Sequence, residues 1–468
     1  MATETRSLPE LLREHGQEHL LTHLDGLDGA TRERLCARLR TIDWDELARP
    51  EVAPEVGEVG ASRVVTLAER QQREERLSAA GEAALREGRV AVLMVAGGQG
   101  TRLGFAGPKG CYPLAPHSGK TLYQLQAEKV LALSRRVGQA VPFLVMTSPV
   151  TDVRTRAAFA EHDRFGLAAG QLRVFRQGTL PSVDRAGRAL LGAPGTLLES
   201  PDGHGGCFTA LVESGELHRL ERAGIRHVVY IQVDNVLAPL DDPAFVGLGV
   251  EERADVVTKV LEKTHPDEKV GHLVRVAGRD RIVEYTELTA EDTRMRAPDG
   301  SLVYRWGSPA LHLWSVAFLA RLASKGFRPP LHRSAKPLRA WLDGALREID
   351  GWKYERFIFD LLPQARVCIG LEIDRASEFS PIKNAEGENS PATAVEGMSR
   401  QYASWLEAAG VEVELSPGAR IEIDPLLAAT RRELVERWDG RVERVTGDLH
   451  LQEDRRVSGA PDRERGEP

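Results

Sequence analysis

The chain of 468 residues has few cysteines and no long apolar run. Its four cysteines, Cys36, Cys111, Cys207 and Cys368, lie far apart and form no CxxC pair, so the sequence indicates neither a structural zinc site nor a disulfide framework. The absence of any run of about 18 apolar residues argues against a membrane-spanning helix. The opening stretch, MATETRSLPELLREHG, lacks the apolar core of a signal peptide. We therefore expect a cytoplasmic protein.

Neither sign of charge dominates the composition. There are 62 Lys and Arg against 69 Asp and Glu, a net charge of −7, so the chain has no electrostatic footprint for nucleic acid. Apolar residues make up 42% and charged residues 28%, as in ordinary soluble globular proteins. Because 468 residues exceed one ordinary core, we expect one large domain with smaller additions.

Residues 5–88 are predicted to be helical. Leucines recur near helical spacing, as at Leu35 and Leu39, and the stretch LAERQQREERLSAAGEAALREG is dense in good helix formers. Gly88 is a plausible stop for this last helix.

Four short apolar runs then follow, each typical of a strand that is buried on both faces. They are RVAVLMVA (89–96), VPFLVMTS (141–148), LRVFRQ (172–177) and HVVYIQVD (227–234). Helical patterns separate them, and this alternation predicts an α/β fold, a doubly wound and mostly parallel sheet with helices on both faces. Ligands of such sheets bind at the carboxyl ends of the strands.

The rest of the chain is less regular. Residues 254–315 favour antiparallel strands, with GRDR (278–281) as a hairpin turn. A helical stretch that includes YERFIFDLLPQA (354–365) should follow, and a helix over 394–410 should lead into a small appended module. The predicted divisions are a helical N-terminal segment (1–88), a central domain (89–391), a small C-terminal module (392–450) and a charged, disordered tail (451–468).

The segment AGGQGTRLGFAGPKG (96–110) directly follows the first buried strand. Small residues at the end of a strand allow backbone N–H groups to approach an anion closely. Arg102 and Lys109 add positive charge beside that concavity. Together they predict a bound polyphosphate, and a glycine-rich turn without a ligand is the simpler alternative.

Spacing excludes two commoner phosphate loops. A dinucleotide fingerprint needs G-x-G-x-x-G, but after Gly98 and Gly100 the next glycine is Gly104, one position late. A Walker loop that ends in Gly119-Lys120-Thr121 would need glycine where Leu114 stands. A NAD-dependent oxidoreductase is therefore disfavoured.

The wider segment LMVAGGQGTRLGFAGPKGCYPL resembles the nucleotide loop of the UDP-N-acetylglucosamine pyrophosphorylase family, within the UDP-sugar pyrophosphorylases. Other motifs resemble that family in its own order over roughly residues 60–420: MTSPVTDVRTRAAFAEHDRFGL, FRQGTLPSVD, SPDGHGGCFTAL, VDNVL, KVLEKTHPDEKVGHLVRV with IVEYTEL, and EFSPIKNAEGENSPATA. The resemblance implies a nucleotidyltransferase fold, Rossmann-like and GT-A-like, with an N-terminal segment and a small C-terminal domain.

It also implies an activity. UTP and N-acetylglucosamine 1-phosphate would give UDP-N-acetylglucosamine and pyrophosphate by in-line attack of the sugar phosphate on the α-phosphorus. The attacking oxygen is already anionic, so catalysis is positioning plus charge neutralisation. Glucose 1-phosphate or N-acetylgalactosamine 1-phosphate as the sugar, and a non-catalytic nucleotide-sugar sensor, are the alternatives. The partners are thus UTP and a sugar 1-phosphate, with no nucleic acid or membrane, and a monomer and a weak dimer both stay open.

The resemblance assigns roles residue by residue. Arg102, Lys109 and Lys383 would be catalytic by clamping phosphates. The nucleotide-binding positions would be Ala96, Gly97, Gly98, Gln177 and Gly203, where the Gln177 amide can donate and accept at the imide edge of uracil. The substrate-binding positions would be His204, Asp234, Gly271, Glu284 and Ser308.

Asp234 is also the predicted metal ligand. It ends the run HVVYIQVD, and Mg²⁺ (or Mn²⁺) often takes one or two protein carboxylates and fills its other positions with phosphate oxygens and water. Two positions depart from the family pattern. His204 stands where animal and fungal members have asparagine in PDGNGG, and Ser308 stands where they have the asparagine of GNIANH. These departures affect the choice of sugar and leave the reaction class unchanged.

Overall fold

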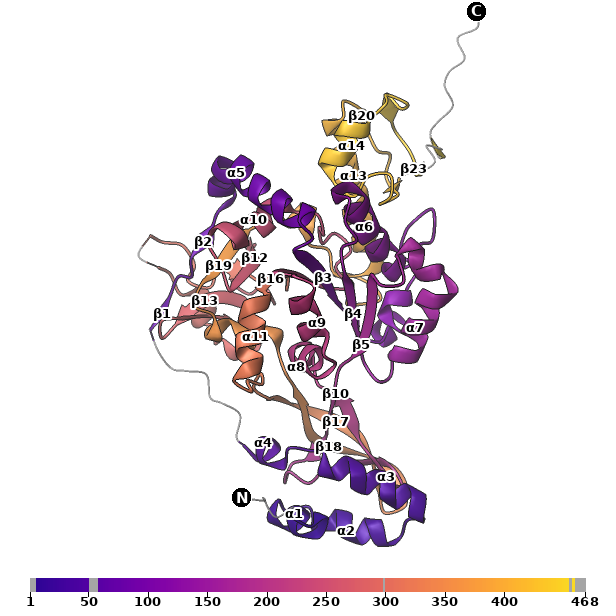
Figure 1. The fold of residues 1–468 in the computed structure, drawn as a ribbon, viewed down its shortest axis with the longest axis vertical. Coiled ribbons are helices and arrows are strands. Elements are labelled where there is room, and N and C mark those ends of the chain that lie inside the picture. Colours follow the sequence, from indigo (N-terminus) through magenta and orange to yellow (C-terminus); the bar gives the residue numbers. More distant parts are fainter. Residues whose placement is uncertain (1–5, 50–57, 298, 454–456, 459–468) are drawn as a thin grey trace, which may run out of the picture. The chain divides into compact units, whose positions relative to one another are not determined.

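The structure is a computed structural model that describes residues 6–49, 58–297, 299–453 and 457–458 (Figure 1). The chain forms two compact units. The first consists of Met1–Glu55, Gln177–Ala210 and Arg328–Leu361, and the second of Val56–Arg176, Leu211–Phe327 and Leu362–Pro468. The predicted boundaries at 88, 391 and 450 concern a different division, into consecutive segments, and stay a prediction.

Four short helices open the first unit: α1 (Leu8–Glu14), α2 (Glu18–Asp25), α3 (Gly29–Arg40) and α4 (Trp44–Ala48). Side-chain oxygens of Ser7, Asp28 and Asp43 accept N–H groups of the first turns of α1, α3 and α4, which fixes where these helices begin. Their buried leucines pack on Leu191 and Leu197. These belong to the hairpin β8 (Leu191–Ala193) and β9 (Thr196–Leu197).

The prediction of helix over 5–88 is confirmed for these four and for α5 (Leu67–Arg86) in the second unit. Residues 5 and 50–57 lie outside the described residues. The prediction is wrong at β1 (Val59–Gly60) and β2 (Val64–Val65). These two strands pair with β13 and β19, distant partners that no local pattern reveals.

The rest of the first unit is built of strands. A long hairpin, β17 (His332–Leu342) and β18 (Ala345–Glu355), pairs with β7 (Val183–Asp184), and β6 (Thr179–Pro181) pairs with β10 (Glu199–Pro201). The helix predicted around 354–365 is wrong over Tyr354 and Glu355, which end β18, and only the 3-10 turn η6 (Ile358–Gln364) is helical. The hairpin turns at Asp343-Gly344, where both φ angles are positive (48° and 82°), as in a two-residue turn of type I′.

A large sheet forms the core of the second unit. β3 (Val90–Val95), β4 (Phe143–Thr147), β5 (Leu172–Arg176) and β11 (His227–Gln232) are parallel neighbours. β16 (His312–Ser315) runs antiparallel between β11 and β12 (Val256–Glu262), and β12 pairs in parallel with β19 (Cys368–Glu372). The predicted α/β fold with a mostly parallel sheet is confirmed.

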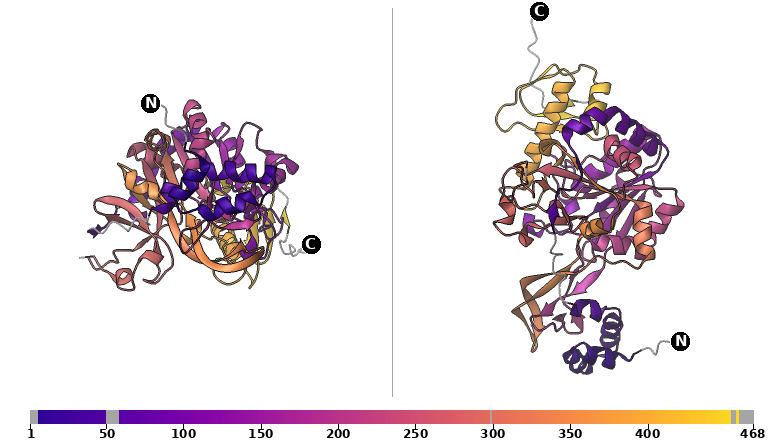
Figure 2. Two further views of the ribbon diagram at one scale, coloured as in Figure 1. Left: turned by 90° about the horizontal axis from the view of Figure 1, so that it is seen from below. Right: turned by 90° about the vertical axis from the view of Figure 1, so that its left-hand side faces the viewer.

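Helices cover both faces of this sheet (Figures 1 and 2). A Cβ added to Gly249 of α10 (Pro243–Glu251) would meet Leu313, so Leu313 faces α10. The next residue, Trp314, stacks on Phe318 of α11 (Val316–Ser324). Because successive strand residues point to opposite faces, α10 and α11 lie on opposite sides. Further helices are α6 (Leu122–Val137), α7 (Asp152–Glu161), α9 (Glu216–Arg222) and α8 (Gly206–Glu213), which begins in the first unit.

The sheet continues into an antiparallel hairpin, β13 (His272–Val276) and β14 (Arg279–Val283), and β13 also pairs with β15 (Trp306–Gly307). The antiparallel prediction for 254–315 is confirmed, because β12 also pairs antiparallel with β15 and β16. Its parallel pairing with β19 lies beyond the predicted segment. The turn is Ala277-Gly278, with φ of 48° and 77°, one residue earlier than predicted.

The C-terminal elements are α13 (Pro391–Ala408), β20 (Glu412–Val413), β21 (Ile421–Ile423), α14 (Arg431–Arg437), β22 (Arg444–Val445) and β23 (Leu449–Leu451). The predicted helix over 394–410 is confirmed. Most of the tail predicted to be disordered, 454–456 and 459–468, lies outside the described residues, and β24 (Val457–Ser458) pairs with β23. No helix in the described part of the chain is long and apolar enough to cross a membrane.

The crossing of α5 and α10 is unusually close. A Cβ on Gly81 would lie 1.8 Å from the carbonyl oxygen of Pro243, and one on Gly247 would lie 1.8 Å from that of Leu77. Both obstacles are backbone atoms, so a side chain at either position would have to push the helices apart.

Gly81→Ala should therefore destabilise the second unit by about 1–3 kcal/mol or more, the usual scale of overpacking. Thermal unfolding followed by circular dichroism measures this. Gly29→Ala is the matched control, because nothing lies within 4 Å of a Cβ there. Equal melting temperatures for the two variants would contradict the close crossing.

Candidate functional site

The glycine loop leaves β3 and doubles back on itself. Gly100 N donates to Gly107 O at 2.8 Å, and Lys109 N donates to Gly98 O at 3.0 Å. Gly104, with φ of 67°, ends the 3-10 turn η1 (Thr101–Leu103). The backbone of Lys109 is thereby fixed beside the start of the loop.

The glycine after Lys109 is a packing requirement. A Cβ on Gly110 would lie 2.1 Å from the ring of Tyr123, which is fully buried in α6 and whose hydroxyl contacts Thr155 Oγ1 at 2.9 Å. Lys109 therefore begins the 3-10 turn η2 (Lys109–Cys111) next to a fully buried ring.

Lys109 reaches the carboxyl end of β11. Its Nζ donates to Asp234 Oδ2 at 2.9 Å and to Ile382 O at 3.1 Å. Asp234 is buried, with 7% of its surface exposed, and its carbonyl accepts Ile382 N at 3.0 Å. The structure thus brings together Lys109, Asp234 and the segment that carries Lys383.

Residues 378–383, here called the strap, carry Lys383 at their end. Beyond the strap the chain folds back, because Lys383 N donates to Asn389 O at 2.6 Å. The side chains of Lys383 and Arg102 are both exposed, so their charges are available to a ligand in solution.

A buried charge network, which sequence reasoning missed, holds the start of the strap. Lys259 of β12 is 1% exposed, and its Nζ contacts Asp242 Oδ2 at 2.6 Å and Glu378 Oε2 at 2.5 Å. Arg70 of α5 contacts Asp242 Oδ1 at 2.9 Å. Burial acts to raise the pKa of Asp242, but Lys259 and Arg70 outweigh it and hold that pKa well below its usual value.

Three residues that the resemblance assigned to the sugar also meet. Ser308 N donates to Gly271 O at 2.8 Å. A Cβ on Gly271 would lie 3.0 Å from Glu284 Oε1, so the carboxylate lies over a residue that has no side chain. Ser308 Oγ accepts the N–H of Ala310 at 3.3 Å, and its O–H is left to donate.

In the first unit, Gln177 meets the loop at 202–206. Its Nε2 donates to Asp202 Oδ1 at 3.2 Å and to Gly203 O at 3.5 Å. Gly203 has φ of 84°, and a Cβ there would lie 2.6 Å from Arg356 O, so both conformation and space require glycine. Arg356 is 4% exposed and pairs with both carboxylate oxygens of Glu46 in α4 at 2.7 Å.

His204 lies in an aromatic cluster that sequence reasoning also missed. Its Nδ1 accepts Ile358 N at 3.1 Å, so the ring proton of the neutral imidazole is on Nε2. The ring stacks on Phe357 and contacts Phe359, with centroids 5.4 and 5.5 Å away. The prediction of a helix over YERFIFDLLPQA is the reason that this cluster was missed. Residues two apart in a helix point in different directions, so a helix would not bring Phe357 and Phe359 together.

A second group of metal-competent side chains, Glu422, Asp424 and His450, lies among the C-terminal elements. Lys120 Nζ contacts Asp424 Oδ1 at 2.8 Å, and Glu422 accepts from the N–H groups of His117 and Ser118 at 2.8 and 3.0 Å. Burial disfavours the Lys120 ammonium, but Glu128 and Asp424 raise its pKa above the usual value. A cation is therefore already in place, and the cluster acts as a link between β21 and the loop at 117–120.

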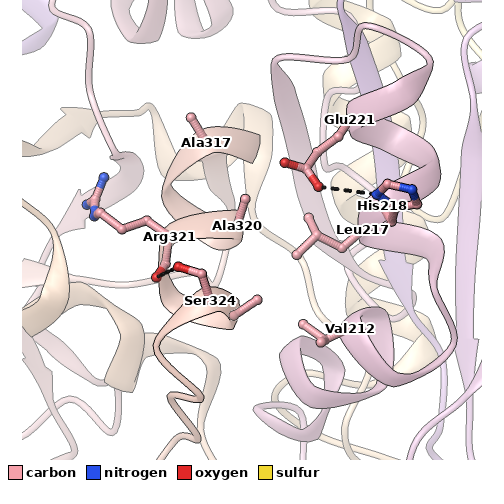
Figure 3. A pocket seen from close by; sticks show the side chains of 9 residues that line it. Val212, Leu217, His218, Glu221, Ala317, Ala320, Arg321 and Ser324 are labelled. Atoms are coloured by element: carbon pink, nitrogen blue, oxygen red, sulfur yellow. Dashed lines mark hydrogen bonds and ion pairs between the residues drawn. The ribbon is translucent and has the colours of Figure 1, made fainter.

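Figure 3 shows a groove between α9 and α11 in the second unit. Small and apolar side chains line most of it, with a contact of 3.9 Å between His218 Nδ1 and Glu221 Oε2 at its edge. None of its lining residues is one of the predicted site residues.

Comparison with known proteins now bears on this geometry. The family described as UTP–glucose-1-phosphate uridylyltransferase matches residues 37–298, more than half of the chain. The chain belongs to this family. Members similar to it include UDP-N-acetylglucosamine diphosphorylase 2 of Arabidopsis thaliana, 35% identical over 87% of this chain and 86% of that protein. UDP-N-acetylglucosamine pyrophosphorylase of Saccharomyces cerevisiae is 37% identical over 74% and 76%.

A solved structure of a family member is also similar. The UDP-N-acetylglucosamine pyrophosphorylase from Trypanosoma brucei, in complex with an inhibitor, aligns with a TM-score of 0.76 at 28% identity, covering 92% of this chain and 95% of that one. The resemblance inferred from the motifs is thus confirmed. The roles assigned to single residues stay predictions.

Proposed function

We propose that the chain is a uridylyltransferase that joins UTP to N-acetylglucosamine 1-phosphate and releases pyrophosphate. The contact of 2.9 Å between Lys109 and Asp234 carries this proposal. It places a lysine and a carboxylate beside a glycine loop, at the carboxyl ends of β3 and β11, in a chain of the uridylyltransferase family. The proposal also includes a cytoplasmic location, and a monomer or weak dimer.

The chemistry requires cations more than a base. The sugar phosphate oxygen is anionic before it attacks, and charge builds on the pyrophosphate that leaves. Lys109, Arg102 and Lys383 would neutralise the phosphates while backbone N–H groups of Ala96, Gly97 and Gly98 hold the nucleotide. Preorganised charges of this kind are a large source of rate enhancement because they need no reorganisation.

Base and sugar would be selected by other residues. The Gln177 amide and the Gly203 backbone can pair with the imide edge of uracil, and a site built for hydrogen bonds rejects a mismatched base. Glu284 can accept two sugar hydroxyl groups. Gly271 and His204 would be further positions that contact the substrate.

The donor set at Asp234 fits a hard divalent cation. Lys109 engages Oδ2, and Oδ1 is the oxygen that we assign to Mg²⁺ or Mn²⁺. One protein carboxylate suffices where phosphate oxygens supply further ligands. When bound, such an ion would supply positive charge that neutralises the phosphates.

A second candidate is a closely related enzyme for glucose 1-phosphate. The observation that favours it is Ser308, whose hydroxyl already accepts the Ala310 N–H and is shorter than the asparagine of the family pattern. The direct test is pyrophosphate release from UTP with a panel of sugar 1-phosphates. No release with any sugar would instead support a nucleotide-sugar sensor.

Lys109→Ala should lower kcat by about 10²-fold or more, the scale of one electrostatic contact in a preorganised site. Pyrophosphate release measures it, and the melting temperature shows that the variant folds. Lys325→Ala, which removes an exposed lysine of the same unit, is the control. A folded Lys109→Ala with normal turnover would remove Lys109 from the site.

Asp234→Asn should weaken Mn²⁺ binding in the presence of UTP, because the amide lacks the charge that a hard cation requires. Electron paramagnetic resonance of free Mn²⁺ measures binding without turnover. The matched control is Asp163→Asn, since the Asp163 side chain is 83% exposed. Unchanged Mn²⁺ affinity, or full activity in excess chelator, would rule out the metal role.

Ser308→Asn should raise the preference for N-acetylglucosamine 1-phosphate over glucose 1-phosphate. A longer amide can pair with the acetamido group, and a buried unpaired polar group costs roughly 1–3 kcal/mol. The ratio of kcat/KM for the two sugars, in wild type and variant, measures the change. A wild type that prefers glucose 1-phosphate by about tenfold, a difference of 1.4 kcal/mol, would overturn the N-acetylglucosamine assignment and leave uridylyl transfer intact.

A further inference from the structure

The residue after Asp234 makes a distinctive pair of contacts. Asn235 is 2% exposed. Its Oδ1 accepts Ser380 N at 3.0 Å, and its Nδ2 donates to Glu378 O at 2.8 Å. Both ends of one buried amide are thus bonded to the backbone of the strap.

These contacts fix the strap against the end of β11. Asn235 and Pro381 also form a backbone bridge, and Ile382 N donates to Asp234 O at 3.0 Å. The path of the chain is therefore set residue by residue up to Ile382, which directly precedes Lys383.

The chemistry of these contacts demands an amide. Aspartate would set a carboxylate oxygen against the Glu378 carbonyl, and an apolar side chain would leave the Ser380 N–H and the Glu378 C=O without their partner. A buried polar group that loses its only partner carries the full cost of desolvation.

We propose that Asn235 is a positioning residue for Lys383. It takes no part in the chemistry itself and touches neither substrate, but it fixes the backbone from which the Lys383 side chain reaches the sugar phosphate. This inference rests on the proposed function, because it needs Lys383 to act on phosphate.

Asn235 can influence the position of Lys383 although it does not contact that side chain. Lys383 has a long, exposed side chain whose freedom is limited chiefly by the place of its own backbone. The two hydrogen bonds of the Asn235 amide hold the backbone at residues 378 and 380. Their loss would free the middle of the strap, between Glu378, which Lys259 holds, and Ile382, which Asp234 holds. A displacement of 1 Å at a reacting group can lower a rate by about 10²-fold.

The decisive experiment is a double-mutant cycle with Asn235→Ala, Lys383→Ala and the double variant. Asn235→Ala alone should lower kcat/KM for the sugar 1-phosphate by about tenfold or more. In the Lys383→Ala background the same change should lower it by less than about threefold, because residues that act through one another are not additive. Equal losses in both backgrounds would overturn the inference.

A buried amide elsewhere provides the matched control. Gln171 is 6% exposed, donates to Val141 O at 2.9 Å and accepts Ala168 N at 3.3 Å. Gln171→Ala should lower the melting temperature about as much as Asn235→Ala while leaving kcat/KM close to that of the wild type. If Gln171→Ala lowers kcat/KM as strongly, the effect of Asn235 is one of general stability and the inference fails.

Hydrogen exchange gives a readout that needs no turnover. A peptide spanning residues 376–386 should exchange faster in Asn235→Ala than in the wild type or Gln171→Ala. Unchanged exchange would overturn the inference even in an inactive protein. If Asn235→Ala does not fold, Asn235→Ser keeps a hydroxyl that can replace one of the two hydrogen bonds, and it should show a smaller change of the same kind.

Failure of the proposed function and failure of the role of Asn235 give different results. A wild type without uridylyl transfer overturns the proposed function before any variant is compared. An active wild type with additive losses overturns only the role of Asn235.

Discussion

A single buried ammonium, that of Lys259, joins three parts of the second unit. Its partners are Asp242, which caps α10 by accepting Phe245 N at 3.2 Å, and Glu378, which begins the strap. Burying one cation between two carboxylates is tolerable only because Arg70 supplies the second positive charge. Removal of one partner from such a network costs about 3–5 kcal/mol, since it leaves a buried charge uncompensated. The network therefore holds the start of the strap at Glu378.

Contacts between residues distant in the sequence also fix the end of β11. Asp234 and Asn235 bind backbone atoms of the strap, which lies more than a hundred residues later in the chain. Lys109 is likewise held by its own backbone N–H and by the ring beneath Gly110. A lysine side chain is flexible, so the proposed phosphate site would gain its accuracy from the fixed backbone of each lysine. Main-chain hydrogen bonds therefore set the positions of Lys109 and Lys383 before any ligand binds.

The sequence predicted the parts of the fold that depend on local pattern. The runs at β3, β4, β5 and β11 are nearly continuous in apolar residues, as strands buried on both faces must be. The β17–β18 hairpin escaped prediction because only four of its 22 strand residues are buried, so its sequence carries little apolar alternation. Lys259 escaped because one lysine in an apolar run gives no sign of partners at 242 and 378. The meeting of Gly271, Glu284 and Ser308 could be expected only from the family resemblance, since no spacing rule connects them.

If these three residues contact the sugar, as we propose, their position would allow the choice of sugar to change while the reaction stays the same. Gly271 and Glu284 flank the β13–β14 hairpin, and Ser308 follows β15, whereas Lys109 and Asp234 follow β3 and β11 at the middle of the sheet. The strands β12 and β16 separate the two groups. A substitution at Ser308 alters a hydrogen-bonding group next to Gly271 without touching the Lys259 network or the strap. Under the proposed roles, a departure from the family pattern at residue 308 would change selectivity, whereas one at Lys109 or Asp234 would remove a charge next to the phosphates.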